Sequence, residues 1–510
     1  MTTRKLNILL LSSEVAPFAK VGGLADVAGS LPKALRALGH DVRVAMPSYA
    51  MVESHPAYAV SDLLSCFPVP VRPGLTEQGY LKRTHILVHA IHAEVPVYLI
   101  GHHGPNGERS GYFHRATESR KIYALEPEPY VFFCRAVLEA LRHMASEWKP
   151  DIIHCNDWQT GLIPVYKRLF YSEVPDLADA ASVFTVHNLA YQGNFEVSQW
   201  PTNGLPFELF HIDGLEFYGQ WTFMKGGLLF AERVNTVSPN YAREIQTEEY
   251  GCGLHGLLRT LSSQGRLVGI LNGIDTEEFN PATDPRIAAH YDADNPQGKA
   301  QCKARLQAEL GLTLSEETAL IGMVSRLADQ KGLDIIQAII ETALQELPVQ
   351  FVLLGTGDQA YEEYFTALQA RYPEQVHARI AFDAELAQRI YSGSDLFLMP
   401  SRFEPCGLGQ MIALRYGTLP IVRATGGLAD TVTDIDPVNP QTGNGFVFDA
   451  YRPEALLATL RRAVTVYQQK PVWQSLVRRA MREDFSWDRS ARSYVALYEE
   501  ALQVRRETAR

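Results

Sequence analysis

The segment LNILLLSSEVAPFAKVGGLADVAGSLPKAL (Leu6–Leu35) begins with a short apolar run and ends with apolar residues at helical spacing. The run is typical of a buried β-strand, and the pair Gly22–Gly23 predicts a tight turn before a helix. The pentapeptide GGLAD of this turn (Gly22–Asp26) occurs again at Gly426–Asp430, in a similar setting. We interpret the two copies as equivalent strand-to-helix corners in two halves of the chain. Chance recurrence of a common turn is the alternative.

Short apolar runs alternate with helical spacing along the whole chain, which is typical of βαβ units and parallel sheets. Because 510 residues exceed what one compact core accommodates, we expect two domains, joined near residues 258–268, where the sequence is polar. The expected strands of the first half are LNILLLSS, DVRVAMP, PVYLI, DIIHC, SVFTVH and RVNTVS. Those of the second half are LVGIL, ALIGMVS, QFVLLG, RIAF, LFLMP and LPIVR.

The predicted architecture is therefore α/β, with two Rossmann-like doubly wound domains at residues 1–264 and 265–485. The last segment, residues 486–510, has Trp487, Tyr494 and Tyr498 at the spacing of an amphipathic helix. Open parallel sheets bind ligands beyond the carboxyl ends of their strands. Two such domains facing one another would form a cleft.

The overall composition excludes several classes of protein. A net charge of −11 argues against nucleic-acid binding, which requires basic surfaces. No apolar stretch reaches the roughly 18–20 residues of a membrane-spanning helix, and the N-terminal apolar run lacks a signal-peptide cleavage pattern. The six cysteines are scattered without a CxxC pair, so neither a zinc site nor a disulfide framework is indicated. We expect a cytoplasmic protein with no nucleic-acid or membrane partner.

Several basic residues and glycines are candidates for holding an anion. Lys20 and the pair Gly22–Gly23 precede a helix, where N–H groups and the helix dipole favour phosphate. A solvated lysine beside a tight turn is the alternative, and neither GxGxxG nor GxxxxGK[ST] is present. Arg326 and Lys331, in VSRLADQKGLD, follow an expected strand and could clamp a diphosphate.

Polar residues follow three further expected strands. In MPSRFEPCGLGQ, Glu404 could accept hydrogen bonds from sugar hydroxyls, or could merely complement the dipole of the next helix. The segments HCNDWQTGL and FTVHNLAYQG place His154, Asn156 and Asp157, and then His187 and Asn188, at strand ends. Two such clusters favour a lined cleft over isolated core residues.

The aspartate pairs in Asp292–Asp294 and Asp434–Asp436 resemble an Asp-x-Asp metal motif. Both lie in loops distant from the strand-end clusters, so we interpret them as solvated turns and predict no metal site and no cofactor.

Taken together, the motifs KVGGLADV, FTVHNLAYQG, VSRLADQKGLD, PSRFEPCGLGQ and RATGGLAD resemble those of bacterial glycogen synthases and plant starch synthases, in the same order and over nearly the whole chain. The resemblance implies a two-Rossmann glycosyltransferase fold of the GT-B type, with a final helix that returns to the first domain. It implies metal-independent, retaining transfer of glucose from a nucleotide diphosphate glucose, which we expect to be ADP-glucose, to the non-reducing end of an α-1,4-glucan, in glycogen biosynthesis.

The resemblance also implies roles for individual residues. Those assigned to catalysis and the diphosphate are Lys20, His187, Arg326, Lys331 and Glu404. Those assigned to binding the donor are Gly22, Gly23, Asp157, Asn188, Phe382, Cys406, Gly407, Leu408 and Gly409. Within this set, Phe382 corresponds to an aromatic residue placed against the adenine.

Some positions depart from the family pattern. Gly409 stands where relatives often carry Thr or Asn, and GHHGPNGERSGYF (residues 101–113) lacks the family's Asp-Arg-rich character, leaving Tyr112 as a candidate on the acceptor side. The resemblance does not distinguish ADP-glucose from UDP-glucose as the donor. The alternatives are another two-Rossmann transferase, such as a sucrose-type synthase or a pyridoxal-phosphate-dependent phosphorylase, and a non-catalytic glucan-binding protein.

Overall fold

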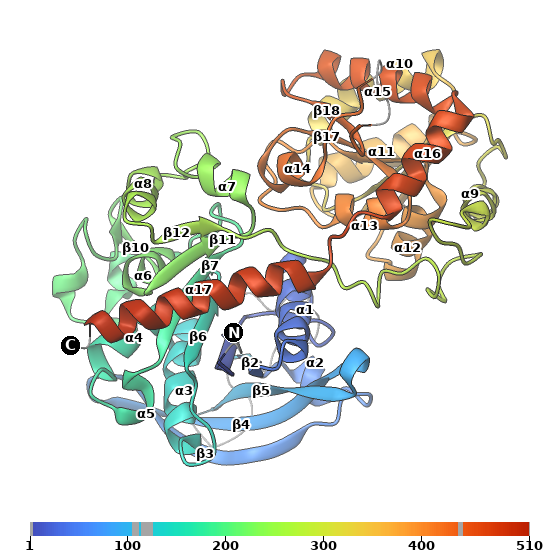
Figure 1. Cartoon of the computed structure of the whole chain (residues 1–510). Helices are drawn as coiled ribbons and strands as arrows, with labels where there is room; N and C mark the ends of the chain where they lie inside the picture. The colour runs from blue at the N-terminus through green and yellow to red at the C-terminus, as the bar shows by residue number, and fades with distance from the viewer. Residues whose placement is uncertain (1–3, 105–111, 114–125, 437–441, 509–510) are drawn as a thin grey trace. The chain divides into compact units, whose positions relative to one another are not determined.

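The computed structural model describes residues 4–104, 112–113, 126–436 and 442–508, and the chain divides into two compact units (Figure 1). The first unit comprises Met1–Val237, Ile245–Gly273 and Trp487–Arg510, and the second comprises Ser238–Glu244 and Ile274–Ser486. Each unit contains a largely parallel sheet with helices, so the α/β prediction is confirmed.

The sheet of the first unit has nine strands among the described residues. Strand order reverses at β1, which lies between β2 and β6, and only β4 and β3 run antiparallel to their neighbours. This doubly wound order defines a switch point between β1 and β6. In sheet order the strands are β12 (Leu267–Gly269), β11 (Arg233–Thr236), β7 (Ala181–Val186), β6 (Ile152–Asn156), β1 (Asn7–Leu11), β2 (Asp41–Pro47), β5 (Ala93–His103), β4 (Leu75–Val88) and β3 (Ser61–Arg72).

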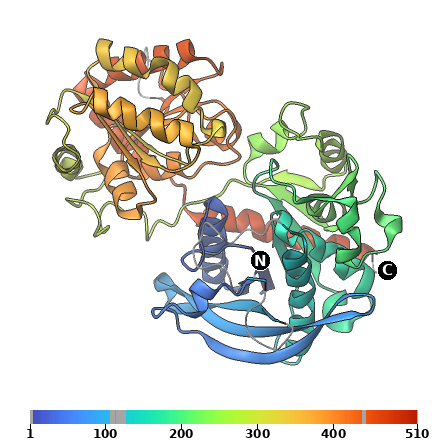
Figure 2. The same cartoon turned by 180° about the vertical axis from the view of Figure 1, so that it is seen from behind.

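Two features of this sheet differ from the sequence prediction. The segment LVGIL, expected as the first strand of the second half, forms β12 and pairs with β11, so that assignment was wrong. The preceding polar segment, interpreted as a junction, belongs to the amphipathic helix α8 (His255–Ser263), which buries Leu258 and Leu261. The long hairpin of β3 and β4, seen at the edge of the sheet in Figure 2, was not predicted.

The other helices of the first unit lie between or beside these strands. They are α1 (Gly23–Ala37), α2 (Ala50–Glu53), α3 (Glu128–Met144), α4 (Leu162–Phe170), α5 (Pro175–Ala178), α6 (Phe223–Phe230) and α17 (Trp487–Thr508). A small sheet of β8 (Asn194–Glu196), β10 (Gln220–Thr222) and β9 (Glu216–Phe217) completes the unit.

The sheet of the second unit has six parallel strands among the described residues, and its order reverses at β13, between β14 and β16. The strands are β15 (Val376–Ile380), β14 (Val349–Gly355), β13 (Ala319–Val324), β16 (Leu396–Met399), β17 (Leu419–Arg423) and β18 (Phe446–Phe448). The helices are α7 (Pro239–Glu244), α9 (Gln297–Glu309), α10 (Leu333–Glu346), α11 (Gln359–Arg371), α12 (Ala384–Gly393), α13 (Gly409–Arg415), α14 (Gly426–Thr431), α15 (Pro453–Tyr467) and α16 (Lys470–Met481).

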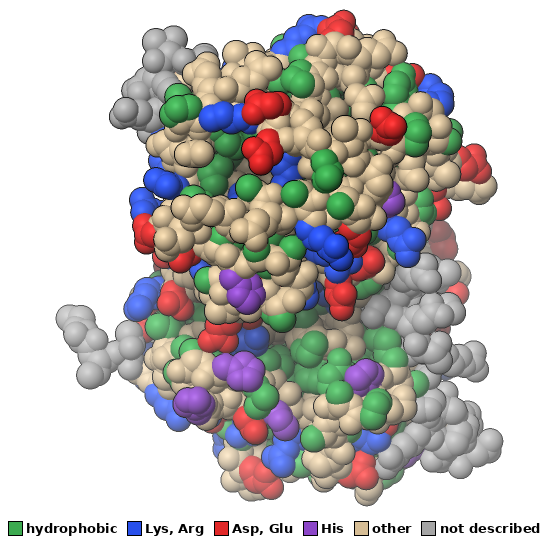
Figure 3. All heavy atoms as spheres, turned by 90° about the vertical axis from the view of Figure 1, so that its right-hand side faces the viewer, with side chains coloured by type: hydrophobic (Ala, Val, Ile, Leu, Met, Phe, Trp, Pro, Cys, Tyr) green, Lys and Arg blue, Asp and Glu red, His purple; other side chains and the backbone are tan. Residues whose placement is uncertain are grey.

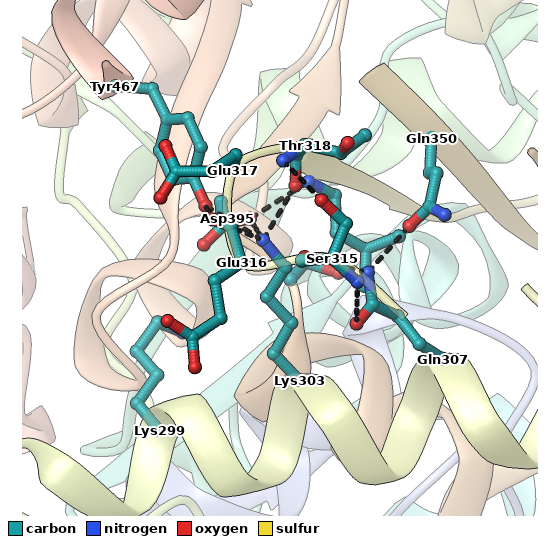
Figure 4. A network of polar contacts seen from close by, with 12 residues as sticks. Lys299, Lys303, Gln307, Ser315, Glu316, Glu317, Thr318, Gln350, Asp395 and Tyr467 are labelled. Atoms are coloured by element: carbon teal, nitrogen blue, oxygen red, sulfur yellow. Dashed lines mark hydrogen bonds and ion pairs between the residues drawn. The ribbon is translucent and has the colours of Figure 1, made fainter. Parts of the chain in front are cut away.

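Two buried lysines anchor α9 to the second unit. Lys303 Nζ forms an ion pair with Asp395 at 2.8 Å and donates to Thr318 O at 2.6 Å (Figure 4). Lys299 Nζ donates to Thr418 Oγ1 at 2.7 Å, and burial lowers the pKa of this lysine to about 8. Such contacts satisfy polar groups that would otherwise be buried without partners.

The C-terminal helix α17 lies in the first unit, beside α1 and β7 (Figure 1). Two of its tyrosines, Tyr494 and Tyr498, form hydrogen bonds with buried polar residues of the sheet. Tyr498 OH donates to His154 Nδ1 at 2.9 Å, and Asn235 Nδ2 donates to Tyr494 OH at 3.2 Å. His154 Nε2 contacts Thr185 Oγ1 at 2.6 Å, so the helix is tied to β6 and β7.

On the face drawn in Figure 3, acidic and basic side chains are interspersed rather than gathered by sign. None of the helices in the described part of the chain is long and apolar enough to span a membrane.

Candidate functional site

The switch point of the second sheet holds one cationic and one acidic residue predicted from the sequence. Lys331 ends a short helical turn that follows β13, and Glu404 lies in the loop after β16. Because β13 and β16 are neighbours, their loops meet, and Lys331 Nζ lies 2.6 Å from Glu404 Oε2. Ligands of open parallel sheets bind at such a point. The fold thus joins two residues that lie 73 positions apart in sequence.

The surroundings of this ion pair fix the Glu404 carboxylate. The side chains of Lys331 and Glu404 are only 17% and 8% exposed, and Ser401 Oγ donates to Glu404 Oε2 at 3.1 Å. The two loops are also joined through the backbone, since Arg402 N donates to Gln330 O at 2.8 Å. Glu404 is therefore a preorganised acceptor at the edge of the sheet.

The neighbouring residues add a cation and a glycine turn. The Arg326 side chain is exposed and lies 3.5 Å from Gln330 Oε1. In the loop after Glu404, Gly407 adopts φ +74°, and the buried Gln410 amide donates to Gly407 O at 2.9 Å. This loop leads directly into α13.

The second GGLAD turn supports the Glu404 loop from one side. Gly427 N donates to Glu404 O at 3.1 Å. Gly426 has φ +46°, and a Cβ there would lie 1.8 Å from Glu404 O, so only glycine fits. Glu244, at the end of α7, accepts hydrogen bonds from Gly426 N at 2.9 Å and from Thr425 Oγ1 at 3.2 Å.

In the first unit, Asp157 and His187 lie together at the carboxyl ends of β6 and β7. Asp157 Oδ1 accepts a hydrogen bond from His187 N at 2.9 Å. Asp157 has φ 58° and ψ 176°, a backbone conformation that is rare for residues other than glycine. Backbone outliers of this kind cluster at functional sites.

Burial sets the protonation of these two side chains. It raises the pKa of Asp157 to about 7, against the opposing hydrogen bond from His187 N, and it lowers the pKa of His187 to about 3. His187 is therefore neutral near pH 7. Its Nε2 lies 2.9 Å from Asn156 Oδ1, while Asn156 Nδ2 donates to Leu11 O. Because an amide oxygen only accepts, the proton of His187 resides on Nε2.

Lys20 lies two residues before the first GGLAD motif. Lys20 Nζ lies 2.6 Å from Asp26 Oδ1, with the lysine side chain 39% exposed. Val21 N and Gly22 N both donate to Glu14 Oε2, at 2.6 and 3.0 Å. Helix α1 begins at the next residue, Gly23.

Gly22 differs from the glycines that packing requires. Its backbone is extended, with φ −149°, and a Cβ built on it meets no described protein atom within 4 Å. Neither conformation nor packing within the described structure therefore explains a glycine here. The backbone at Gly22 is therefore open enough for a ligand to approach it closely.

The structure also places three further residues named from the sequence: Phe382, Asn188 and Tyr112. Phe382, after β15, is 78% exposed. Asn188 Oδ1 accepts from Ala190 N at 3.1 Å, within its own loop. Tyr112 donates to Glu77 Oε1 at 3.2 Å, whereas residues 105–111 of the segment before it lie outside the described part of the chain.

The predicted residues divide between the two units. Those of the first unit are Lys20, Gly22, Gly23, Asp157, His187 and Asn188. Those of the second are Arg326, Lys331, Phe382, Glu404, Cys406, Gly407, Leu408 and Gly409. Sequence reasoning missed Glu14 and Glu244, which hold the two glycine turns. Only Glu14 had a signal, as an acidic residue directly after a strand.

Comparison with protein families matches both halves of the chain. Residues 7–260 match the starch synthase catalytic domain, and residues 311–472 match the glycosyl transferases group 1. The chain is 48% identical over 504 residues to the glycogen synthase of Moorella thermoacetica, covering 99% of this chain and 98% of that one. It is 46% identical over 503 residues to the glycogen synthase of Thermotoga maritima, covering 98% and 99%.

Solved structures show the same relationship. The catalytic domain of starch synthase IV from Arabidopsis thaliana, bound to ADP and acarbose, matches with a TM-score of 0.89 and 35% identity, covering 98% of this chain and all of that one. Sucrose-phosphate synthase from Thermosynechococcus elongatus matches with a TM-score of 0.59 and 20% identity, which shows a shared fold alone.

Proposed function

The chain belongs to the family of glycogen synthases and starch synthases, which makes it a glucosyltransferase of the GT-B fold, and on that premise we propose that its donor is ADP-glucose and its acceptor the non-reducing end of an α-1,4-glucan. The observation that carries this proposal is the Lys331–Glu404 pair at the switch point of the second sheet. It combines a cation suited to phosphate with an acceptor suited to sugar hydroxyls. The related starch synthase bound to ADP supports an adenine nucleotide.

Arg326 and Lys331 hold the diphosphate in this proposal. Breaking the bond between the glucosyl C1 and the phosphate oxygen leaves negative charge on the diphosphate. Cations already in place stabilise that charge without reorganisation, which is usually the largest catalytic effect. Lys20, with the open backbone at Gly22, contributes a further cationic contact to the donor.

Glu404 and Asp157 serve as hydroxyl acceptors for the transferred glucose, and neutral His187 contacts the sugar through its ring. In the transfer step the acceptor hydroxyl oxygen bonds to C1 on the face that the diphosphate leaves. Its proton passes to the departing phosphate oxygen. Because the new bond forms on the same face as the old one breaks, configuration is retained. In this scheme Glu404, held by Lys331 and Ser401, accepts sugar hydroxyls and does not attack C1. Trapping a covalent glucosyl–Glu404 adduct would overturn this scheme.

A donor comparison tests the proposal. Purified protein is incubated with glycogen and either ADP-glucose or UDP-glucose, and released nucleotide and glucan chain growth are both measured. We expect growth with ADP-glucose at a kcat/KM well above that with UDP-glucose. Equal or reversed preference would contradict the donor assignment, and no growth with either donor would contradict the whole function.

The role of Lys331 is tested in the same assay. Lys331→Met keeps the length of the side chain but removes its charge, and we expect a loss of about 2–4 kcal/mol in transition-state stabilisation, seen as a fall in kcat. The control is Lys303→Met, which removes another buried ion pair of the second unit, away from the switch point. Equal losses in the two variants would show that Lys331 acts through stability alone.

A further inference from the structure

Glu14 holds the turn that carries Lys20. Its side chain lies in a loop just beyond the carboxyl end of β1, and the residue is only 2% exposed. One carboxylate oxygen, Oε2, accepts both Val21 N and Gly22 N. A buried carboxylate that accepts two successive backbone N–H groups restricts the path of the turn, because its loss would remove the protein acceptor of both donors.

The position of Glu14 links this turn to the Asp157 cluster. Strands β1 and β6 are paired, with Leu11 beside Cys155, so the residues that follow the two strands lie at one edge of the sheet. The Glu14 charge acts on the Asp157 carboxyl and contributes to its raised pKa, after the larger effect of burial. Glu14 thus contacts the backbone of the turn next to Lys20, and its charge also acts on Asp157.

The second unit contains the same arrangement. There Glu244 Oε1 accepts the N–H of Gly426, the first glycine of the second GGLAD, as Glu14 accepts that of Gly22 in the first copy. The aspartate that closes each copy is also engaged: Asp26 binds the Lys20 ammonium, and Asp430 accepts from Asn240 N at 2.7 Å. In both copies, therefore, a glutamate carboxylate accepts the N–H of the first glycine, from the buried Glu14 in the first unit and the half-buried Glu244 in the second.

We propose that Glu14 is a positioning residue for glucosyl transfer: it orders the Lys20–Gly22 turn so that the Lys20 ammonium and the open backbone at Gly22 meet the donor. This inference rests on the proposed function. Glu14 acts through the backbone in this proposal, because its Oε2 accepts the hydrogen bonds of Val21 N and Gly22 N. Displacing a positioned group by about 1 Å can lower the rate about 100-fold.

The test compares two replacements of similar size. Glu14→Gln keeps an oxygen that can accept both N–H groups, whereas Glu14→Met fills the same space without an acceptor. The matched control is Glu232, which is 6% exposed and whose Oε2 accepts Ser182 N at 2.7 Å. Ser182 lies near the start of β7, so this carboxylate is at the opposite edge of the sheet.

We expect Glu14→Gln to stay within about threefold of the wild-type kcat and Glu14→Met to fall about 10–100-fold below it. Glu232→Gln and Glu232→Met should both retain the wild-type kcat, while the two Met variants lose similar amounts in Tm. The inference would be overturned if the ratio of kcat between Glu14→Gln and Glu14→Met were no larger than the ratio of kcat between Glu232→Gln and Glu232→Met. A Glu14→Met enzyme with wild-type kcat would also overturn it. Inactive wild-type protein would instead contradict the proposed function, so the two failures are distinct.

Discussion

Asp157 joins two features that are each unfavourable for folding: a backbone with positive φ and a buried carboxyl group. Both are found at the end of a strand beside the switch point. Such combinations are retained where a function requires them. The sequence identified this residue only through its position after DIIHC and through the family motif, because neither φ nor burial can be seen in a list of residues.

The raised pKa of Asp157 gives a prediction for pH dependence. Its pKa is about 7 in the folded protein and 3.8 when the group is free, so between these values the folded state holds more protons than the unfolded state. Stability from this group therefore falls as pH rises from about 4 to 7. If the ionised carboxylate accepts glucosyl hydroxyls, kcat/KM for the donor should fall as pH drops through 7.

Asp157→Asn tests both effects, because Asn has nearly the same shape as Asp and keeps an oxygen that can accept the hydrogen bond of His187 N. We expect greater stability than wild type by about 1–3 kcal/mol at pH 8, a difference that shrinks towards pH 4. We also expect a lower kcat/KM without the acid limb. Urea unfolding and pH–rate profiles measure these quantities, and an unchanged acid limb would assign that limb to another group.

Gly22 and Gly426 occupy the same position in the two GGLAD copies, yet the structure predicts opposite results for alanine. At Gly22 the Cβ has room and the backbone is extended, so Gly22→Ala should leave Tm within a few degrees of wild type while lowering kcat/KM for the donor. At Gly426 the Cβ would collide with Glu404 O, so Gly426→Ala should lose stability. Thermal unfolding and donor kinetics separate them. A fully active Gly22→Ala enzyme would show that no ligand approaches this backbone.

At the scale of elements, the buried parallel strands were predicted well because they are continuous apolar runs. DVRVAMP and LPIVR match β2 and β17 residue for residue. The hairpin of β3 and β4 escaped because one face of it is solvated and its pattern is mixed. Only the end of β3 alternates clearly, burying Phe67, Val69 and Val71. Strand β12 was misassigned because a three-residue strand carries no signal of the sheet it joins.

The same limit applies to the candidate site. Loops that follow strands could be recognised one at a time, but the contact between Lys331 and Glu404 depends on the pairing of β13 with β16, which strand patterns do not reveal. Glu14 and Glu244 were missed for a related reason. Each acts through a backbone N–H of a distant turn, and no residue type marks that partner in the sequence.

The C-terminal helix α17 supports a prediction about stability. Tyr498→Phe removes the donor to His154 Nδ1 and leaves a fully buried nitrogen without its partner. We expect the free energy of unfolding to fall by about 1–3 kcal/mol. Urea titration measures it, with Tyr218→Phe, whose side chain is 80% exposed, as the control expected to change little. Equal effects would mean that the buried hydroxyl contributes nothing.

At the scale of the whole molecule, neither unit is a single uninterrupted piece of chain. The first unit takes its last segment from Trp487–Arg510, after the second unit has been formed from Ile274–Ser486 and the short segment Ser238–Glu244. A segment joins the unit in which its buried polar groups find hydrogen-bond partners, even when that unit is distant in sequence. Tyr498 and His154 are 344 positions apart and still share a hydrogen bond.

That late segment determines the order in which the protein matures during synthesis. Until the final residues are synthesised, His154 and Asn235 lack their hydrogen-bond partners Tyr498 and Tyr494, although most of the first unit has already been translated. The second unit has all of its residues available sooner. We therefore expect the first unit, most of which is translated first, to complete its folding last. A stop codon shortly before α17 should leave the first unit incomplete and the second unit intact.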